Sequence, residues 1–568
     1  MFPSTIAALL YVATIRFEFV YDDVSQIVLN PFVHTWKAFP LLFTTDVWRF
    51  QNPLIVGSFW RPIFSLWLLI NYALFGTNSI GWHATTVAIY SLSTYTVYRL
   101  VLRLGADPWL ATFAALIFAV HPAHLESAAW VSGVTDSLLS IFLFISLLCF
   151  IRGTARNNTD SLWIALSVVF YALAILTKET AIVEPVLVAT YVFLFSSEIR
   201  RVRKAAILTF PFLVLTALYL IARHSVLHEF SHVYLPISSR DALVALPSLI
   251  YFYGKHLLWP VGLSVIYDAS PITNLQWTNF WGPAVTILLV VICGAAYLWR
   301  SRDRISAFAF VLLVVPLLPA LNIRVLEPGN FLHDRYLFLP SAGFALLIAR
   351  QIRRLRFGES RVFGISGIQV ALMATLMLAG AYATASQQIY WANDVLLFSR
   401  ATTVAPANET AFNNLGTALA AHGRKNEAIL AFQQVIKRNP HAWRALYNLG
   451  LGNFMDGRYK EAEFYLRRAV EANTLEGDPS ALLAEALIRQ GRYSEAEGAI
   501  EYALKVMPYK PGYRRVLALS LEGQGRLPEA IRAARSEQQN HPNNEETQKL
   551  LERLEGEARA TDRFSRGK

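Results

Sequence analysis

Apolar segments of nearly membrane-spanning length recur through roughly the first 390 residues, and they restrict the fold of this chain more than any other feature. A bilayer is crossed only by helices, which satisfy their own backbone hydrogen bonds, or by closed barrels. The apolar segments lie at 1–15, 81–103, 109–121, 134–151, 161–177, 180–196, 205–222, 280–299, 305–321, 336–350 and 362–385. The sequence therefore predicts an all-α, polytopic membrane domain with about eleven spans.

The composition agrees with an integral membrane protein, because 54% of the residues are hydrophobic and only 16% are charged. The formal net charge is +11, and arginines cluster in short loops between apolar segments. That arrangement is typical of cytoplasmic loops and not of a nucleic-acid-binding surface, so no nucleic-acid partner is expected. Cys149 and Cys293 lie in separate apolar segments, which predicts no disulfide framework.

The charges of the loops predict which side of the membrane each loop faces. Basic loops occupy every second gap between apolar segments, and their sequences are RLVLRLG, IRGTARNN, EIRRVRK, WRSRDR and RQIRRLRFGESR. By the positive-inside rule these loops and the N-terminus are cytoplasmic, and the other loops face outward. The apolar stretch 242–266 would break this alternation as a span, so we expect it to be an outer-surface or re-entrant helix.

The first apolar segment lacks a basic n-region and a small-residue cleavage site, so we interpret it as a retained first span. Its roughly 15 apolar residues are fewer than the ~20 of a full span. Two explanations of this short length are open: the helix lies at a shallow depth in the membrane, or the sequence lacks residues at its N-terminus.

Ionisable residues other than the loop arginines collect in the outward-facing loops. They are Asp22 and Asp23 in the first such loop, His121, His124 and Glu126 in the second, Lys178 and Glu179 in the third, and Arg324, His333, Asp334 and Arg335 in the fifth. Charge at a membrane boundary is costly unless it is paired or solvated, so loops that converge on one face suggest a site. Ordinary loop solvation is the alternative, but aromatic and apolar neighbours in FVYDD and HDRYLFLP favour the site.

The last part of the chain is a repeat array. Glycine recurs every 34 residues at 423, 457, 491 and 525, and alanine at 428, 462, 496 and 530. This is the tetratricopeptide period, in which small residues allow two helices to pack closely. The predicted domains are a membrane domain at 1–389, a tetratricopeptide-repeat α-solenoid at 390–560 and a tail at 561–568. The predicted repeats are 409–442, 443–476, 477–510 and 511–544, after a half-repeat at 390–406. The topology places the array outside the cytoplasm.

The predicted outer face limits the chemistry of a transferase. Nucleotide sugars and ATP are scarce there, so we expect a donor that the membrane delivers, such as a sugar on a polyprenyl phosphate. A carboxylate could take the proton of an acceptor hydroxyl as its oxygen attacks the anomeric carbon. Lys178, Arg324 or Arg335 could bind the phosphate leaving group.

Several ordered motifs also resemble a known family. They are FVYDDVSQIVLNP, WRPIFSLWLLINYALFG, GWHATTVAIYSL, HPAHLESAAWVSGVTDSL, TKETAI, LLWPVGLSVIYD and DRYLFLPSAGF, followed by the repeats. Together they resemble the transmembrane and tetratricopeptide-repeat O-mannosyltransferases of the GT-C superfamily. The resemblance implies transfer of a sugar, expected to be mannose, from a polyprenyl phosphate to Ser or Thr hydroxyls of proteins. It also implies that Asp22 is the catalytic base, Asp23 its partner and Glu126 a second active-site acid. We expect a bacterial-type homologue in an inner membrane, although its first span and its array are shorter than the family's.

Other interpretations of these motifs remain open at this stage. His121, His124 and Glu126 have the spacing of zinc ligands, but the pattern is commoner as a polar loop. Arg61 could form a salt bridge with an outer carboxylate or extend toward the interface. Lys178 and Glu179 could belong to the site or pair with each other, and His333 is a further candidate. We assign no metal ligand and no firmly implied cofactor, and the metal requirement stays open.

The repeats carry the predicted acceptor contacts. Asn414 and Asn448 occupy the sixth position of the first two repeats, where a side-chain amide can bind a peptide backbone without reading its sequence. Alternatively, these asparagines follow the consensus of the repeat and have no role in binding an acceptor. Two other functions compete with protein glycosylation: a non-catalytic envelope scaffold, and a transferase acting on a lipid or glycan with the array recruiting partner proteins.

Overall fold

The computed structural model describes residues 2–51, 57–154, 159–196, 198–228, 237–268, 275–326, 330–355, 361–362, 365–542 and 544–566. The chain forms two compact units, Met1–Asn408 and Glu409–Lys568. The first unit thus extends past residue 389 and includes α16 (Asp394–Val404), which the sequence assigned to a half-repeat. The physical reason is local packing, because Phe398 of α16 contacts the Tyr21 ring of the first unit.

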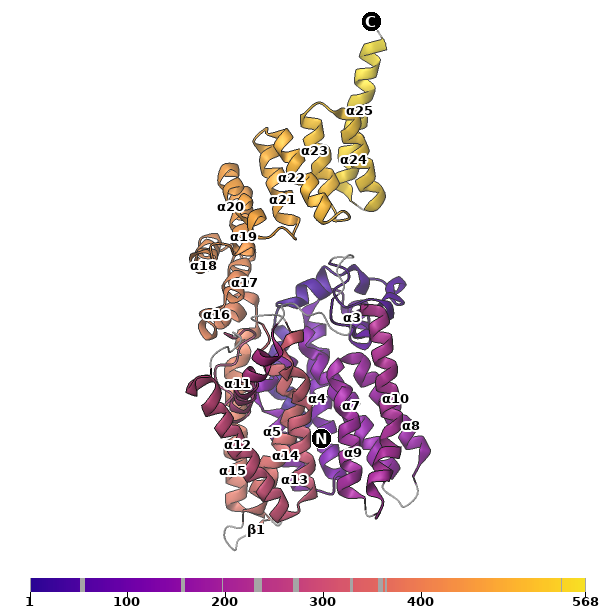
Figure 1. Ribbon diagram of the computed structural model, residues 1–568, viewed down its shortest axis with the longest axis vertical. Helices are drawn as coiled ribbons and strands as arrows, with labels where there is room; N and C mark the ends of the chain where they lie inside the picture. The colour runs from indigo at the N-terminus through magenta and orange to yellow at the C-terminus, as the bar shows by residue number, and fades with distance from the viewer. Residues whose placement is uncertain are drawn as a thin grey trace. The chain divides into compact units, whose positions relative to one another are not determined.

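The first unit is a bundle of helices (Figure 1). Its α-helices besides α16 are α1 (Phe2–Tyr11), α2 (Leu41–Thr44), α3 (Pro62–Phe75), α4 (Ser79–Arg103), α5 (Pro108–Ala119), α6 (Leu125–Ala128), α7 (Thr135–Thr154), α8 (Ser161–Thr177), α9 (Glu184–Phe195), α10 (Arg201–Leu227), α11 (Ser239–Leu258), α12 (Gly282–Ser301), α13 (Arg304–Val314), α14 (Phe338–Arg354) and α15 (Gly367–Gln388). Every predicted apolar segment overlaps one of these helices.

Short helical turns and one hairpin connect the longer helices. The turns are η1 (Val12–Arg16), η2 (Val24–Val28), η3 (Pro31–Val33), η4 (Trp36–Ala38), η5 (Pro122–His124), η6 (Ser132–Val134), η7 (Glu179–Val183), η8 (Trp277–Trp281), η9 (Val315–Leu321), η10 (Ile323–Val325), η11 (Asp334–Leu337) and η12 (Ile389–Trp391). Strands β1 (Arg361–Val362) and β2 (Ile365–Ser366) pair antiparallel, with Arg361 opposite Ser366.

Fewer helices than the predicted eleven have the length and apolar character of a complete span. In the described part of the chain, five segments qualify: Ser132–Thr154, Arg201–Leu227, Trp277–Ser301, Arg304–Leu321 and Gly367–Trp391. A sixth arises if the bent pair Pro108–Ala119 and Pro122–Ala128 is one span. The segments Phe2–Arg16, Pro62–Phe75 and Ser161–Thr177 are apolar but shorter. The structure therefore supports a multi-span membrane protein with fewer full-length spans than the hydropathy pattern predicts.

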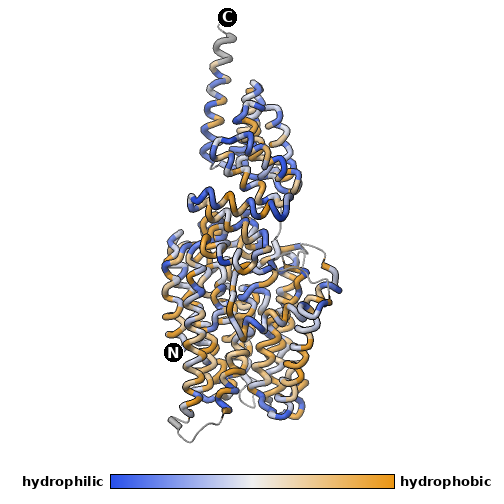
Figure 2. Tube along the Cα trace, turned by 90° about the vertical axis from the view of Figure 1, so that its left-hand side faces the viewer, coloured by the Kyte–Doolittle hydropathy of each residue, from blue (hydrophilic) through white to orange (hydrophobic). Residues whose placement is uncertain are grey.

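Helix α7 occupies the interior of this bundle. It packs against α8 and α4, and 78% of its span is buried, compared with 6% of the Trp277–Ser301 span that contains α12. Figure 2 shows hydrophobic residues along the bundle helices, as expected for helices that contact one another and lipid.

Several of the predicted cytoplasmic loops meet at one end of the bundle. The Asp303 carboxylate binds Arg350 at 3.0 Å and Arg354 at 2.7 Å, and Asp107 lies 3.4 Å from Arg353. These arginines belong to the last turns of α14, whereas Arg335 precedes its first residue. Because a helix rises 1.5 Å per residue, Arg335 and this basic end lie at opposite ends of α14.

The second unit is the predicted tetratricopeptide-repeat solenoid. Its helices pair as α17 (Glu409–Ala421) with α18 (Lys425–Arg438), α19 (Trp443–Met455) with α20 (Tyr459–Ala472), α21 (Asp478–Arg489) with α22 (Tyr493–Val506), and α23 (Tyr513–Gly523) with α24 (Leu527–Asn540), followed by α25 (Glu545–Arg566). The recurring glycines Gly423, Gly457 and Gly491 each have φ +75°. A left-handed residue ends the first helix of each pair, and glycine adopts that conformation without a steric penalty.

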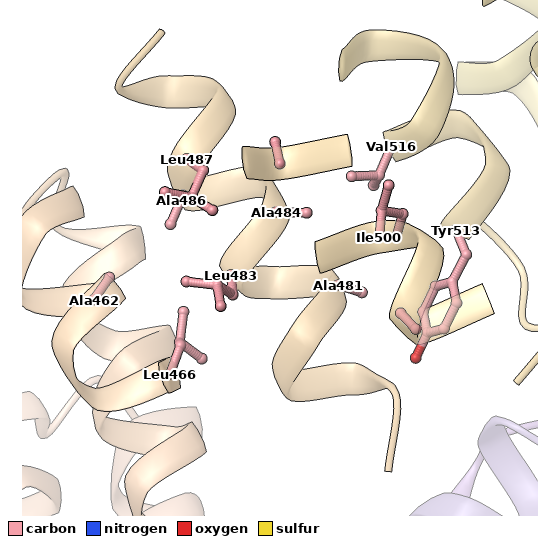
Figure 3. Packing of buried hydrophobic residues seen from close by; sticks show 12 residues of the cluster. Ala462, Leu466, Ala481, Leu483, Ala484, Ala486, Leu487, Ile500, Tyr513 and Val516 are labelled. Atoms are coloured by element: carbon pink, nitrogen blue, oxygen red, sulfur yellow. The ribbon is translucent and has the colours of Figure 1, made fainter. Parts of the chain in front are cut away.

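Small and branched residues build the core of the array (Figure 3). Leu466 of α20 lies near Leu483 of α21, and Ile500 of α22 lies near Val516 of α23.

Polar side chains connect neighbouring repeats. Glu463 accepts hydrogen bonds from Gln490 at 3.1 Å and Arg492 at 2.6 Å, and the equivalent Glu497 accepts from Gln524 and Arg526. The 34-residue period therefore sets both the core and a polar ladder.

Candidate active site

A cavity of about 380 Å³ lies within the first unit. Its ionisable lining residues are Asp22, Arg61, Asp136, Lys178, Glu179, Arg223 and Arg335. Aromatic side chains, including Trp130 and Tyr336, form other parts of the wall. A partly apolar pocket with convergent charged groups is typical of a ligand site. Residues of several predicted outward-facing loops thus line one cavity, and they include Asn322 and Val325 on either side of Arg324.

The two adjacent acids point in different directions. Both follow η1 and precede η2, which is a single π-helical turn, a feature frequent at functional sites. Asp22 is half-buried and lines the cavity. Asp23 is fully buried, and its carboxylate accepts the Ser132 N–H at 2.8 Å, the Ser132 hydroxyl at 2.5 Å and the Val20 N–H at 3.2 Å. Burial raises the pKa of Asp23 from 3.8 to about 7, and those hydrogen bonds oppose the rise.

Arg61 and Glu179 form a bidentate ion pair at the cavity wall. Arg61 precedes the first residue of α3, and its Nε and Nη2 donate to the two Glu179 oxygens at 3.1 and 2.6 Å. Burial would raise the pKa of Glu179, but the charge of Arg61 outweighs it and lowers the value to about 2. The salt-bridge interpretation of Arg61 is confirmed.

Lys178 pairs with a residue that sequence reasoning did not select. Its ammonium donates to both oxygens of Asp136, at 2.6 and 2.7 Å, and the two side chains are 3% and 5% exposed. Burial lowers the pKa of Lys178, and the negative charge of Asp136 opposes the change. Since Glu179 binds Arg61, the alternative in which Lys178 and Glu179 pair only with each other is wrong.

Glu126 binds the segment that carries Arg335. Its carboxylate accepts the Arg335 backbone N–H at 2.9 Å and the Nη1 at 2.5 Å, and His333 Nδ1 lies 3.3 Å away. The Arg335 guanidinium also lies over the rings of Trp130 and Tyr336, 5.5 and 5.6 Å from their centroids. Glu126 and the two rings therefore hold the Arg335 guanidinium at the cavity wall.

Six predicted site residues of the first unit are not among the lining residues. Asp23, Glu126 and His333 contact Ser132, Arg335 and Glu126 respectively, whereas His121, His124 and Arg324 have other partners. His121 contacts the Leu257 carbonyl at 3.0 Å, and His124 lies between the Tyr90 hydroxyl at 2.9 Å and Ser341 at 2.7 Å. Arg324 is exposed and donates to Ser239 at 3.2 Å.

The histidines do not converge with Glu126 in the manner of a zinc site. Among the residues with described positions, no group of three or more His, Cys, Asp or Glu side chains could hold a metal ion. The partners of His121 and His124 are instead carbonyl and hydroxyl groups.

Sequence reasoning missed Ser132, Asp136 and Arg223. Arg223 lies near the end of the apolar helix α10, where it donates to the Ser58 carbonyl at 2.5 Å. A cation in such a helix is by itself a signal of a functional site. Ser132 and Asp136 lie within the motif HPAHLESAAWVSGVTDSL, but nothing in their local pattern names Asp23 and Lys178 as partners.

The predicted acceptor residues lie on the first helices of neighbouring repeats. Asn414 belongs to α17 and Asn448 to α19, and both are half-buried. The Asn448 amide donates to the Asn413 side-chain oxygen at 3.1 Å and to the Thr417 hydroxyl at 3.4 Å. Asn448 therefore links the first two repeats, in addition to any contact with an acceptor.

Comparison with known families matches both units. Residues 61–227 match the family described as dolichyl-phosphate-mannose-protein mannosyltransferase, and residues 413–476 and 482–545 match the tetratricopeptide repeat. The first match contains most of the charged cavity residues, from Arg61 to Arg223.

Curated relatives match about three quarters of the chain. A protein O-mannosyl-transferase of Caenorhabditis elegans is 26% identical over 76% of this chain and 61% of its own length. Tmtc1 of Drosophila melanogaster is 26% identical over 77% of this chain and 61% of its own length. TMTC3 of Homo sapiens is 25% identical over 74% of this chain and 49% of its own length. The matched region thus spans less than two thirds of the length of each relative.

Solved structures resemble the chain only in part. The crystal structure of MamA is 22% identical, with a TM-score of 0.24, over 27% of this chain and 83% of that chain. A thermophilic tetratricopeptide-repeat protein of Thermus thermophilus is 19% identical, with a TM-score of 0.25, over 32% of this chain and 95% of that chain. Both family matches and the curated relatives agree, so the chain is similar to the transmembrane and tetratricopeptide-repeat O-mannosyltransferases in its membrane part and in its repeats.

Proposed function

We propose that this chain transfers a mannosyl group from a polyprenyl-phosphate donor to Ser or Thr hydroxyls of proteins. The observation that carries the proposal is the composition of the cavity, where Asp22 lies together with the cations Arg61, Lys178, Arg223 and Arg335. A carboxylate beside several cations suits a reaction in which a hydroxyl loses a proton and a phosphate leaves. The names of the matched family and relatives support the same chemistry.

In the proposed reaction, the Asp22 carboxylate accepts the proton of the acceptor hydroxyl. The hydroxyl oxygen forms a bond to the anomeric carbon, and the bond from that carbon to the phosphate oxygen breaks. The phosphate leaves with the bonding electrons, and Arg335 and Lys178 stabilise its charge, Arg335 through paired N–H groups. Asp23 shapes the loop through Ser132, and Glu126 holds Arg335 in position.

The location of the reaction is part of the proposal. The cavity residue Arg335 and the basic loop residues Arg350 and Arg354 lie at opposite ends of α14. With the basic end cytoplasmic, the cavity opens toward the extracytoplasmic side, which for a bacterial-type homologue is the outer side of the inner membrane. The repeat array then binds acceptor or partner proteins on that side.

Asp22→Asn tests the proposed function. We expect at least a ~100-fold lower transfer rate, because the amide cannot accept the proton while its shape is unchanged. Asp107→Asn is the matched control: it lies at the basic end of the bundle, and asparagine replaces aspartate well as the N-cap of α5. Equal transfer rates of Asp22→Asn and the wild type would refute the assignment. Glycoproteomics of membranes with and without the chain would identify the sugar and the acceptor.

A further inference from the structure

The backbone just before the paired acids is in an unusual conformation. Tyr21 has φ +55°, in the left-handed region that bulky residues rarely adopt. Among the described non-glycine residues, the others with positive φ are His228 and Arg302. Those two end helices α10 and α12, where a left-handed residue is common. Tyr21 ends no helix, so other contacts must hold it in this conformation.

The start of α16 provides these contacts. The Asp394 carboxylate accepts the Tyr21 N–H at 2.7 Å, and the backbone N–H of Glu18 donates to the Ala392 carbonyl at 3.0 Å. The Tyr21 ring packs edge-on against Phe398, with centroids 5.8 Å apart. Residues 18–21 are therefore attached to α16 and to Ala392, just before it, by two hydrogen bonds and one ring contact.

The turn that follows Tyr21 separates the two acids. The Asp23 N–H donates to the Val20 carbonyl at 3.0 Å, and the Asp23 carboxylate accepts the Val20 N–H at 3.2 Å. This closed turn buries Asp23 and leaves Asp22 at the cavity wall. A change of φ at Tyr21 would rotate the turn and move the Asp22 carboxylate relative to the cations of the cavity.

We infer that Asp394 is a positioning residue for the proposed transfer reaction, because its hydrogen bond to Tyr21 holds the turn that presents Asp22 to the cavity. This inference rests on the proposed function. It assigns α16, which precedes the repeat array, to the catalytic unit. Asp394 acts through Tyr21, and it does not touch the substrate.

A purely structural role for Asp394 is the alternative. Asp394 is the first residue of α16, where a carboxylate also stabilises the helix dipole. The N-cap is the neighbouring Asn393, whose side chain accepts the Leu396 N–H at 3.0 Å. Asn393→Ala therefore weakens the same helix start without removing the contact to Tyr21, and it is the matched control.

The test compares Asp394→Ala, Asp394→Asn and Asn393→Ala in the full chain, with kcat and donor KM measured in native membranes. Asp394→Ala should lower kcat at least ~10-fold and leave the donor KM within about twofold, since misplacement of a reacting group slows the chemical step. Asp394→Asn should retain most of kcat, because its amide oxygen can accept the same N–H. Asn393→Ala should resemble the wild type.

Equal losses of kcat in Asp394→Ala and Asn393→Ala would overturn the inference, as would an unchanged kcat in Asp394→Ala. If Asp394→Ala does not accumulate, Asp394→Glu replaces it in the test. Asp394→Glu should lower kcat, because it shifts the carboxylate by one methylene. A wild-type kcat in Asp394→Glu would overturn the inference. Asp22→Asn is measured in parallel. A loss there with none in Asp394→Ala refutes only the positioning role, whereas no loss in Asp22→Asn refutes the proposed function.

Discussion

The buried carboxylate of Asp23 accepts hydrogen bonds from both the backbone N–H and the hydroxyl of Ser132, at 2.8 and 2.5 Å. Its neighbour Asp22 faces the cavity instead. Two carboxylates adjacent in the sequence thus have different environments. Asp23 joins the first loop to η6, and Asp22 is accessible from the cavity, where the proposed reaction takes place. This division makes the consequences of changing each acid distinguishable.

Asp23→Asn should change how stability depends on pH. The folded-state pKa of Asp23 is about 7, above its ordinary 3.8, so the folded chain binds more protons than the unfolded chain between these values. The contribution of Asp23 to stability is therefore fully present below about pH 4 and is lost as the pH rises to about 7. Thermal unfolding of the solubilised wild type and of Asp23→Asn from pH 4 to 8 measures the difference.

Asp107→Asn is the control for this pH series, because the half-buried Asp107 is replaced by an equally good helix cap. A constant difference in melting temperature between the wild type and Asp23→Asn across the series would show that Asp23 has an ordinary pKa.

Lys178→Met should destabilise the chain by ~3–5 kcal/mol, because it leaves the buried Asp136 carboxylate without its cation. The double variant Lys178→Met with Asp136→Asn should recover much of this stability, since no buried charge then lacks a partner. Transfer should stay low in both variants if Lys178 binds the phosphate. If the stable double variant transfers sugar at the wild-type rate, the pair of Lys178 and Asp136 has a purely structural role and Lys178 does not bind the phosphate.

Arg335→Lys should raise the donor KM by about 10- to 100-fold, the equivalent of losing one charged hydrogen bond of ~1.5–3 kcal/mol. Lysine keeps a positive charge beside Glu126 but cannot form paired hydrogen bonds to a phosphate. Arg324→Lys is the comparison, because Arg324 is exposed and lies outside the cavity lining. Steady-state kinetics with varied donor measures both. A larger effect at Arg324 would place the phosphate site elsewhere.

Asn414 and Asn448, replaced together by Ala, should reduce transfer to a full-length protein acceptor while leaving transfer to a short hydroxyl peptide unchanged. The loss should be selective because only a long acceptor can reach the array. Asn448→Ala also removes hydrogen bonds to Asn413 and Thr417, so a melting measurement must accompany it. Thr417→Ala is the control for that structural contribution. Equal effects on both acceptors would leave the array as a docking module for partner proteins.

Local patterns in the sequence predicted much of the architecture. The 34-residue period predicted the helix pairs, because each left-handed turn needs glycine at a position such as Gly457 regardless of its distant neighbours. Apolar segments predicted where helices occur in the membrane unit. They overestimated the number of complete spans, since several of these helices, such as Phe2–Arg16 and Ser161–Thr177, are too short to cross a membrane alone.

The sequence by itself determined the helical class, the repeat array and the loops that carry the charged residues, because these follow from periodicity and turn chemistry within short segments. The tertiary structure alone decided the partners: Glu179 for Arg61, Asp136 for Lys178 and Ser132 for Asp23. It also placed α16 against Tyr21. The physical reason is that these pairs join residues far apart in the chain, and their distances depend on how whole helices pack, which no local pattern encodes.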